Sequence, residues 1–245
     1  MRAKLLTYII FGMLLANVFA DGLPYKGKKA NFIGDSITKG TQSYVATVKN
    51  LLGLSVARNY GIGGGSLCCR NNIPWLKDRM FNGKKIDATY MPMVRRWQDM
   101  DNDADIIFIL IGTNDFSSKV PIGGINSIDK NEFNGGLNIV LKGLKKKYPD
   151  KLIIVSTILK RRNENEHLTE YNAAIKDACK RYEIICYDAY SESGLDFGRE
   201  FNKNVMTTTR DGLHPNVAGA EILGQRIAEF ILSLRFQIKP QQEKK

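Results

Sequence analysis

The sequence predicts a single α/β domain, a three-layer α/β/α sandwich built around a five-stranded parallel sheet. Three observations point to this fold class. The 245 residues are enough for one well-buried domain and few for two. Short apolar runs alternate with helical stretches along the chain, as they do in proteins with parallel sheets. One of the runs is apolar without a break from Ile106 to Ile111, as expected of a central strand covered on both faces.

Each element follows from a local pattern. The strands are expected where short apolar runs end at glycine or polar residues, at 30–33, 54–59, 105–111, 151–155 and 184–187. Helices are expected where apolar residues recur at helical spacing, at 44–52, 131–148 and 171–182. A last helix is expected to open at Pro215, a favoured first-turn residue, and to run to about residue 234. The domain is thus predicted over 30–235, between a linker at 21–29 and a polar tail at 236–245.

The first twenty residues have the pattern of a secretory signal peptide. Arg2 and Lys4 precede an apolar run at 5–15, and small residues occupy the −3 and −1 positions of a cleavage site after Ala20. The run is shorter than the roughly 20 residues that a membrane span needs. We therefore expect a secreted or periplasmic protein with no stable membrane insertion after signal removal; a retained anchor is the alternative.

Charge and cysteine content favour neither nucleic-acid binding nor a metal site. The net charge is +11, but the basic residues are scattered or lie on solvent faces, as at 145–147, without interleaved aromatic residues. The four cysteines are Cys68, Cys69, Cys179 and Cys186. No Cys-x-x-Cys pair occurs, so no metal is expected. Export would permit a disulfide from the Cys68/Cys69 region, whereas the favoured interpretation of Cys179 is simple packing on an apolar helix face.

Two short motifs near opposite ends of the chain carry candidate catalytic residues. Ser36, in Gly34-Asp35-Ser36, follows a predicted strand, where its hydroxyl is exposed beside the N–H groups of a helix start. His214 can accept and return a proton. Asp211, three residues earlier, can orient the imidazole and stabilise its charged form. Alternatively, the serine is a simple helix cap, and the aspartate and histidine cap the last helix.

Two intervening motifs offer donors for a developing negative charge. Asn114, in Gly112-Thr113-Asn114-Asp115, follows the strongest strand, and Gly64 lies in a glycine cluster where the backbone can approach a ligand closely. Asp115 is expected to support its loop. Ordinary turn chemistry is the alternative for both loops. Because ligands of open parallel sheets bind at the carboxyl ends of the strands, we expect all these residues on one edge.

The ordered set Gly34-Asp35-Ser36, 59–64, 112–115 and 211–215 resembles the four motif blocks of the SGNH (GDSL-type) hydrolase family, over residues 30–235. The resemblance implies a flavodoxin-like fold and serine esterase chemistry without a metal or cofactor. It implies that Ser36 is the nucleophile of a triad with Asp211 and His214, and that Ser36, Gly64 and Asn114 form the oxyanion hole. Gly63 and Gly65 are alternatives to Gly64. The chain lacks the Gly-x-Ser-x-Gly turn of α/β-hydrolases.

Two long segments, 66–103 and 116–128, are expected to select the substrate. Trp75 and Trp97, in the first, are candidates for substrate contact, unless they form a local core; His167 is expected to be a surface residue near a helix start. The expected function is a secreted esterase that removes a short acyl group from carbohydrate, with acetyl as the favoured group. The alternatives are a lipid esterase or thioesterase, and a catalytically silent carbohydrate-binding protein.

Overall fold

The computed structural model describes residues 23–40, 43–69, 79–81, 84–86 and 92–234. In this part of the chain, five parallel strands form one sheet in the order β2-β1-β5-β6-β7. They are β1 (Lys29–Gly34), β2 (Val56–Gly61), β5 (Ile106–Leu110), β6 (Leu152–Ser156) and β7 (Ile185–Tyr187). A separate antiparallel pair joins β3 (Arg79–Phe81) to β4 (Lys84–Ile86). All five predicted parallel strands are confirmed, each close to its expected range.

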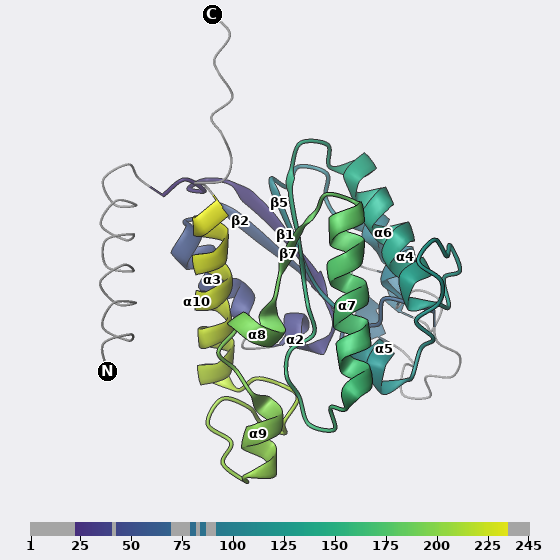
Figure 1. The fold of residues 1–245 in the computed structure, drawn as a ribbon. Helices are drawn as coiled ribbons and strands as arrows, with labels where there is room; N and C mark the ends of the chain where they lie inside the picture. Colours follow the sequence, from purple (N-terminus) through teal and green to yellow (C-terminus); the bar gives the residue numbers. More distant parts are fainter. Residues whose placement is uncertain (1–22, 41–42, 70–78, 82–83, 87–91, 235–245) are drawn as a thin grey trace, which may run out of the picture.

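Helices cover both faces of the sheet, which confirms the predicted three-layer fold (Figure 1). One layer holds α3 (Tyr44–Leu52) and α10 (Val217–Leu234), and the other holds α4 (Met93–Arg96), α6 (Phe133–Lys147) and α7 (Glu166–Arg181). Shorter helices are α2 (Ser36–Lys39), η1 (Trp97–Asp99), α5 (Thr113–Ser117), α8 (Ala189–Glu192) and α9 (Phe197–Asn202). Within the described ranges, no helix has the length and apolar character to cross a membrane.

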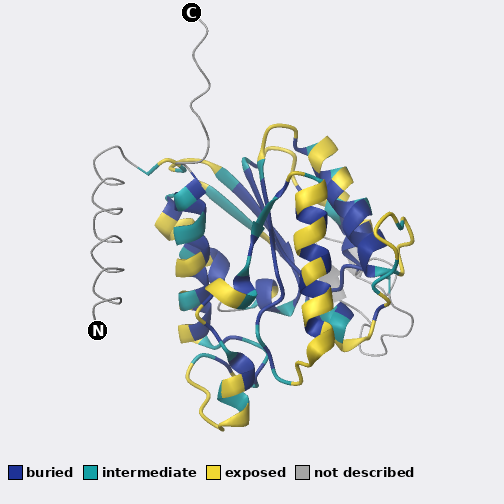
Figure 2. Cartoon of the chain, in the orientation of Figure 1, coloured by how far each residue is buried: buried dark blue, intermediate teal, exposed yellow. Residues whose placement is uncertain are grey.

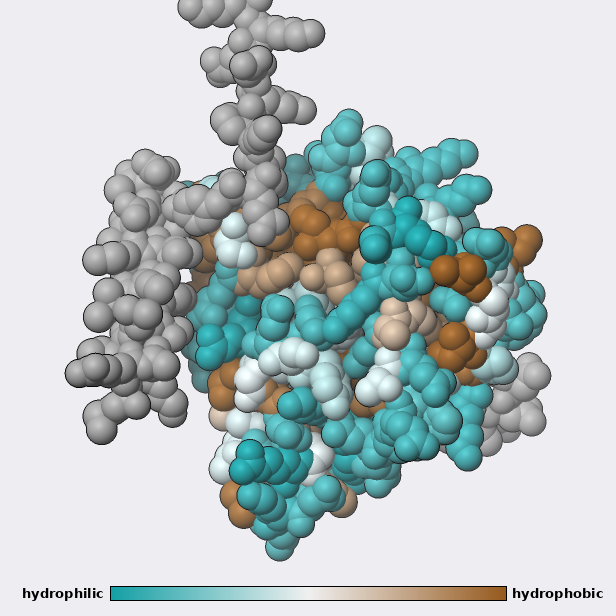
Figure 3. All heavy atoms as spheres, in the orientation of Figure 1, coloured by the Kyte–Doolittle hydropathy of each residue, from teal (hydrophilic) through white to brown (hydrophobic). Residues whose placement is uncertain are grey.

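The two faces of β5 fill two separate cores. Ile107 and Ile109 pack into the cluster under α6 and α7, whereas Ile106 and Phe108 pack into the cluster under α3 and α10. Successive side chains of a strand point to opposite faces, so an unbroken apolar run serves both layers. Figure 2 shows the middle of the sheet as buried: β5 is buried along its whole length, whereas the edge strand β2 is buried only at its last two residues. The face drawn in Figure 3 is mostly hydrophilic, with hydrophobic residues gathered between the two helix layers.

The last helix begins later than the sequence predicts. Pro215 forms an isolated antiparallel bridge with Thr209, so the chain is still extended at the proline. The side chain of Asn216 then accepts a hydrogen bond from the N–H of Gly219 at 3.0 Å, as a helix cap does. The prediction that α10 opens at Pro215 is wrong, because the bridge draws this residue into the preceding loop.

The cysteines are free thiols, and Cys179 is buried in the core under α6 and α7, as the sequence predicts for a packing residue. The expected signal peptide at 1–20, the expected polar tail at 236–245 and Trp75 lie outside the described residues.

The strand order creates a switch in chain direction beside β1. From β1 the chain crosses to β2 on one side, and it later returns to β5 on the other side of β1. The loops that follow β1 and β5 therefore diverge, which in open parallel sheets leaves a crevice at the carboxyl ends of the strands. Ser36 follows β1 and Asn114 follows β5, so the fold places both predicted residues at this crevice.

Candidate active site

A continuous chain of hydrogen bonds joins the three residues predicted for the triad. The hydroxyl oxygen of Ser36 lies 2.9 Å from Nε2 of His214, and Nδ1 of the same ring lies 2.8 Å from Oδ2 of Asp211. The serine comes from the start of α2, whereas the other two residues belong to the loop before α10. The side chain of His214 is 26 % exposed, so the imidazole is accessible to solvent although most of it is covered by the protein.

The loop at 207–215, here called the base loop, fixes the carboxylate of Asp211. Its Oδ1 accepts the backbone N–H groups of Leu213 at 3.0 Å and His214 at 2.8 Å, which leaves Oδ2 for the imidazole. Partial burial alone would raise the pKa of Asp211, but the hydrogen bonds from His214 and Leu213 outweigh it and hold the pKa below its ordinary value. The hydroxyl of Thr209 also donates to the carbonyl of His214 at 2.8 Å. An ionised, oriented partner for the imidazole results.

The turn that presents Ser36 is capped by its neighbour. Oδ1 of Asp35 accepts the N–H of Ile37 at 2.8 Å and so caps the first turn of α2. Asp35 is fully buried, and burial raises its pKa to about 7. The hydrogen bond from Ile37 opposes this rise but does not cancel it.

The two predicted oxyanion donors lie in loops that are hydrogen-bonded to each other. The side-chain amide of Asn114 donates to the carbonyl oxygen of Gly65 at 2.8 Å, which ties the loop after β5 to the glycine cluster after β2. Gly64 has φ +75°, a left-handed conformation that favours glycine. The N–H of Gly65 donates to the carbonyl of Ile62 at 2.9 Å. That bond engages the N–H of Gly65 within its own loop.

The sequence predicts that Asp115 supports its own loop, and in the structure its side chain binds the end of the neighbouring glycine loop. Its two carboxylate oxygens accept the N–H groups of Leu67 and Cys68, both at 2.9 Å. The carboxylate therefore fixes the chain just beyond the glycine cluster, and it makes these contacts while fully buried.

Two buried arginines complete the site and were missed by the sequence reasoning. Arg96, on α4, donates from Nη2 to the carbonyl of Gly34 at 2.7 Å and from Nη1 to the carbonyl of Tyr60 at 2.8 Å. Arg161, after β6, donates from Nη1 to the carbonyl of Thr113 at 2.7 Å. For Arg161, the only signal in the sequence is its position in the loop after a predicted strand. For Arg96 the sequence holds no signal, because nothing in it distinguishes this buried arginine from its exposed neighbour Arg95.

This arrangement can activate an alcohol. A serine hydroxyl in contact with an imidazole can pass its proton to the ring, because the carboxylate on the other ring nitrogen stabilises the resulting imidazolium. The described residues contain no group of three or more His, Cys, Asp or Glu side chains placed to hold a metal ion.

A sequence profile of the GDSL-like lipase/acylhydrolase family matches residues 32–222. The chain belongs to this family. Its members are ester-hydrolysing enzymes, and the resemblance carried by the four motif blocks is confirmed. No match was found among curated proteins.

Solved structures share the fold of this GDSL-family chain. A Lactobacillus plantarum protein is 23 % identical with a TM-score of 0.71, over 87 % of this chain and 99 % of that chain. An acetyl xylan esterase from Geobacillus stearothermophilus is 22 % identical with a TM-score of 0.54, over 84 % and 95 %. A Bacteroides ovatus protein, provisionally described as a GDSL-like lipase, is 17 % identical with a TM-score of 0.58, over 84 % and 98 %. At these identities the likeness shows the fold alone.

Of the two predicted tryptophans, only Trp97 lies within the described residues, and it lies away from the triad. Trp75 lies outside the described residues. Trp97 packs against the core under α6, where a Cβ added to Gly143 would come within 2.3 Å of its ring. Trp97 is thus a packing residue in this structure, in line with the local-core alternative.

Proposed function

We propose that this chain is a serine esterase that cleaves carboxylic esters through an acyl-enzyme, with acetylated carbohydrate as its substrate. The observation that carries the proposal is the hydrogen-bonded series Ser36, His214 and Asp211, with distances of 2.9 and 2.8 Å. Membership in the GDSL-like lipase/acylhydrolase family supports the same chemistry.

The first half-reaction forms the acyl-enzyme. As Oγ of Ser36 attacks the ester carbonyl carbon, Nε2 of His214 takes its proton, and Asp211 stabilises the imidazolium. The carbonyl oxygen becomes an oxyanion, held by the N–H groups of Ser36 and Gly64 and the amide of Asn114. When the tetrahedral intermediate collapses, the bond to the alcohol oxygen breaks. His214 returns the proton to that oxygen, and the alcohol leaves.

The second half-reaction releases the acid. A water molecule gives a proton to His214 as its oxygen attacks the acyl carbon. The second tetrahedral intermediate collapses with cleavage of the bond to Oγ of Ser36, which takes the proton back from the imidazole. The products are a carboxylic acid and the enzyme in its starting form.

Two observations favour an acetyl ester over a long-chain lipid. The imidazole of His214 and the side chain of Ser36 are partly exposed, and the described residues do not enclose them in an apolar tunnel. One structure of similar fold is an acetyl xylan esterase. A signal peptide at 1–20 would add that the enzyme acts outside the cytoplasm, which N-terminal sequencing of the mature protein tests.

The experiment is hydrolysis of p-nitrophenyl esters of increasing acyl length by the purified protein and by Ser36→Ala. We expect a preference for acetate and a loss of at least about 1,000-fold in kcat for the variant. Long-chain preference would instead indicate a lipid esterase. Absence of turnover that depends on Ser36 would leave a carbohydrate-binding protein and refute the esterase.

A further inference from the structure

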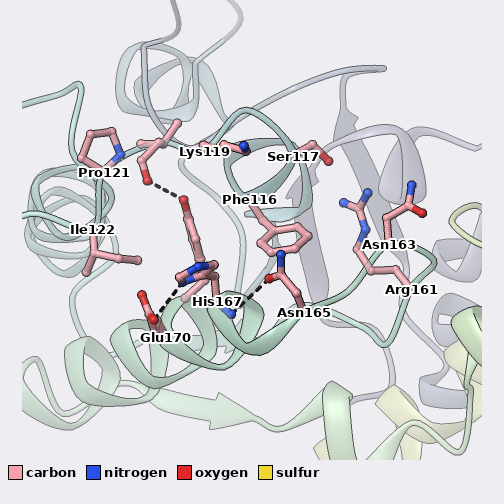
Figure 4. Close-up of a pocket in the computed structure, with 12 residues that line it drawn as sticks. Phe116, Ser117, Lys119, Pro121, Ile122, Arg161, Asn163, Asn165, His167 and Glu170 are labelled. Atoms are coloured by element: carbon pink, nitrogen blue, oxygen red, sulfur yellow. Dashed lines mark hydrogen bonds and ion pairs between the residues drawn. The ribbon is translucent and has the colours of Figure 1, made fainter.

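A cavity of about 620 Å³ opens between the segment that follows α5 and the loop that leads from β6 into α7 (Figure 4). One wall carries Phe116, Lys119 and Ile122, and the other carries Arg161 and Asn163. The mechanism above uses none of these side chains. The first wall belongs to the segment 116–128, which the sequence singled out as a long loop able to select a substrate.

Arg161 ties this cavity to the proposed active site. Its buried guanidinium lines the cavity and donates from Nη1 to the carbonyl and the hydroxyl of Thr113, at 2.7 and 2.6 Å. Thr113 directly precedes the oxyanion residue Asn114. The next residue, Arg162, donates its backbone N–H to the carbonyl of Gly212 at 2.7 Å, inside the base loop. The wall that carries Arg161 and Asn163 is therefore hydrogen-bonded both to the loop that carries Asn114 and to the base loop.

The lining combines an aromatic surface with hydrogen-bonding groups. The ring of Phe116 is held between the guanidinium of Arg161, 5.2 Å from its centre, and the ring of Tyr171, edge-on at 5.8 Å. The exposed hydrogen-bonding side chains around it are those of Ser117, Lys119, Asn163, Asn165, His167 and Glu170. The imidazole of His167 is held by Glu170 at 3.0 Å, on the first turns of α7 (Figure 4).

We infer that this cavity binds the sugar portion of an acylated carbohydrate whose ester carbonyl lies at Ser36. The inference rests on the proposed esterase function. The volume falls within the range of about 300–1,000 Å³ usual for small-molecule sites, and it is far more than an acetyl group needs.

A hydroxyl-rich ring fits this lining better than a long acyl chain does. An acyl chain would displace water from Lys119, Asn163 and His167 without replacing its hydrogen bonds, which is unfavourable. A sugar supplies hydroxyl groups to the same side chains while its apolar face covers the Phe116 ring. The polar groups on the rim therefore select a carbohydrate as the alcohol side of the ester.

The test compares two acetate esters that differ only in the alcohol. The wild-type protein, Phe116→Ala and Asn163→Ala are assayed with acetylated xylo- and gluco-oligosaccharides and with methyl acetate, whose methanol is too small to reach the cavity. We expect the wild type to prefer an acetylated oligosaccharide. We expect the ratio of kcat/KM, oligosaccharide to methyl acetate, to fall by about tenfold or more in both variants. Phe116→Tyr, which keeps the ring, should restore most of the ratio.

Asn50→Ala, an exposed substitution on α3 at the other face of the sheet, is the matched control and should leave the ratio as in the wild type. A ratio within about twofold of wild type in both cavity variants would overturn the inference, as would a wild type that prefers methyl acetate over every acetylated oligosaccharide. If no acetate ester is hydrolysed in a Ser36-dependent way, the esterase proposal itself fails. That outcome is distinct, because it appears already with methyl acetate.

Discussion

Asp35 and Ser36 are neighbours in the chain, yet their surroundings differ sharply. The serine hydroxyl meets an imidazole at a partly exposed turn, whereas the aspartate is fully buried. One carboxylate oxygen, Oδ1, caps α2, and the other, Oδ2, has no hydrogen-bond partner in the described part of the chain. A buried carboxyl in this setting favours its neutral form, which explains why its pKa rises to about 7.

This raised pKa predicts a pH-dependent stability. Between about pH 4 and pH 7, Asp35 ionises in the unfolded chain but stays protonated in the folded one, so the free energy of unfolding falls as pH rises. Asp35→Asn keeps the cap oxygen and removes the titration. We expect its free energy of unfolding, relative to wild type, to increase by roughly 2–4 kcal/mol from about pH 4 to about pH 8. Urea denaturation at several pH values measures this; a constant difference would contradict it.

Asn114 allows a prediction about the chemical step. Its amide lies beside the glycine loop, and we propose that it holds the oxyanion in the transition state. Asn114→Ala should lower kcat for p-nitrophenyl acetate by roughly 100- to 1,000-fold, with a smaller effect on KM. A circular dichroism spectrum like that of the wild type would show that the fold is intact. Unchanged turnover would remove this residue from the mechanism.

At the scale of elements, one side chain of α4 joins the ends of two strands. The guanidinium of Arg96 binds the carbonyl of Gly34, the last residue of β1, and the carbonyl of Tyr60, the last residue but one of β2. Gly34, whose carbonyl is one of the two, is also two residues before Ser36. The short helix α4 thus helps to position the loop that carries Ser36 and the start of the glycine loop.

Replacing this guanidinium should cost stability and activity together. Arg96→Met removes two hydrogen bonds from a charged donor, each worth about 1.5–3 kcal/mol, so we expect the free energy of unfolding to fall by roughly 2–5 kcal/mol. The carbonyl of Gly34 keeps the N–H of Ile62 as a second donor. Arg95→Met, at the exposed neighbour on the same helix, is the matched control and should stay within about 0.5 kcal/mol of wild type. Urea denaturation decides; equal losses in the two variants would contradict the role of Arg96.

The sequence predicted the parts of this site that local patterns encode. The parallel strands were found because buried strands are continuous apolar runs, and Ser36, Asp211 and His214 were found because they stand in motifs. Helices of four to six residues, such as α2 and α5, are too short to show a helical period. The burial of Arg96 is decided by packing between distant segments, and the bridge at Pro215 depends on Thr209. The residues next to Arg96 and Pro215 in the sequence therefore predict neither the burial of the arginine nor the bridge at the proline.

At the scale of the whole molecule, the sheet is shared by two cores. One lies under α6 and α7 and the other under α3 and α10, and alternate residues of β5 contribute to each. Because the same strands contribute side chains to both cores, unfolding of one core removes the strands on which the other core packs. We therefore expect the described domain to unfold in one cooperative step.

Leu223, fully buried on α10, tests this expectation. Leu223→Ala should lower the free energy of unfolding by about 2–5 kcal/mol through the lost burial and the cavity that remains. Tryptophan fluorescence, which includes Trp97 on the opposite face, and far-UV circular dichroism should give the same midpoint and slope. Leu51→Ala, at an exposed leucine of α3, is the control and should change stability by less than about 0.5 kcal/mol. Two separated transitions would contradict the shared core.

The hydroxyl of Ser36 and the imidazole of His214 are 178 residues apart in sequence. The base loop takes its place only when α10 docks on α3, and α10 is the last helix of the described chain. During synthesis, the N-terminal strands can assemble before that segment has left the ribosome, but the proton acceptor cannot. We therefore expect the proposed hydrolysis to begin only once α10 has docked on α3, so that the return of esterase activity after refolding reports the docking of α10.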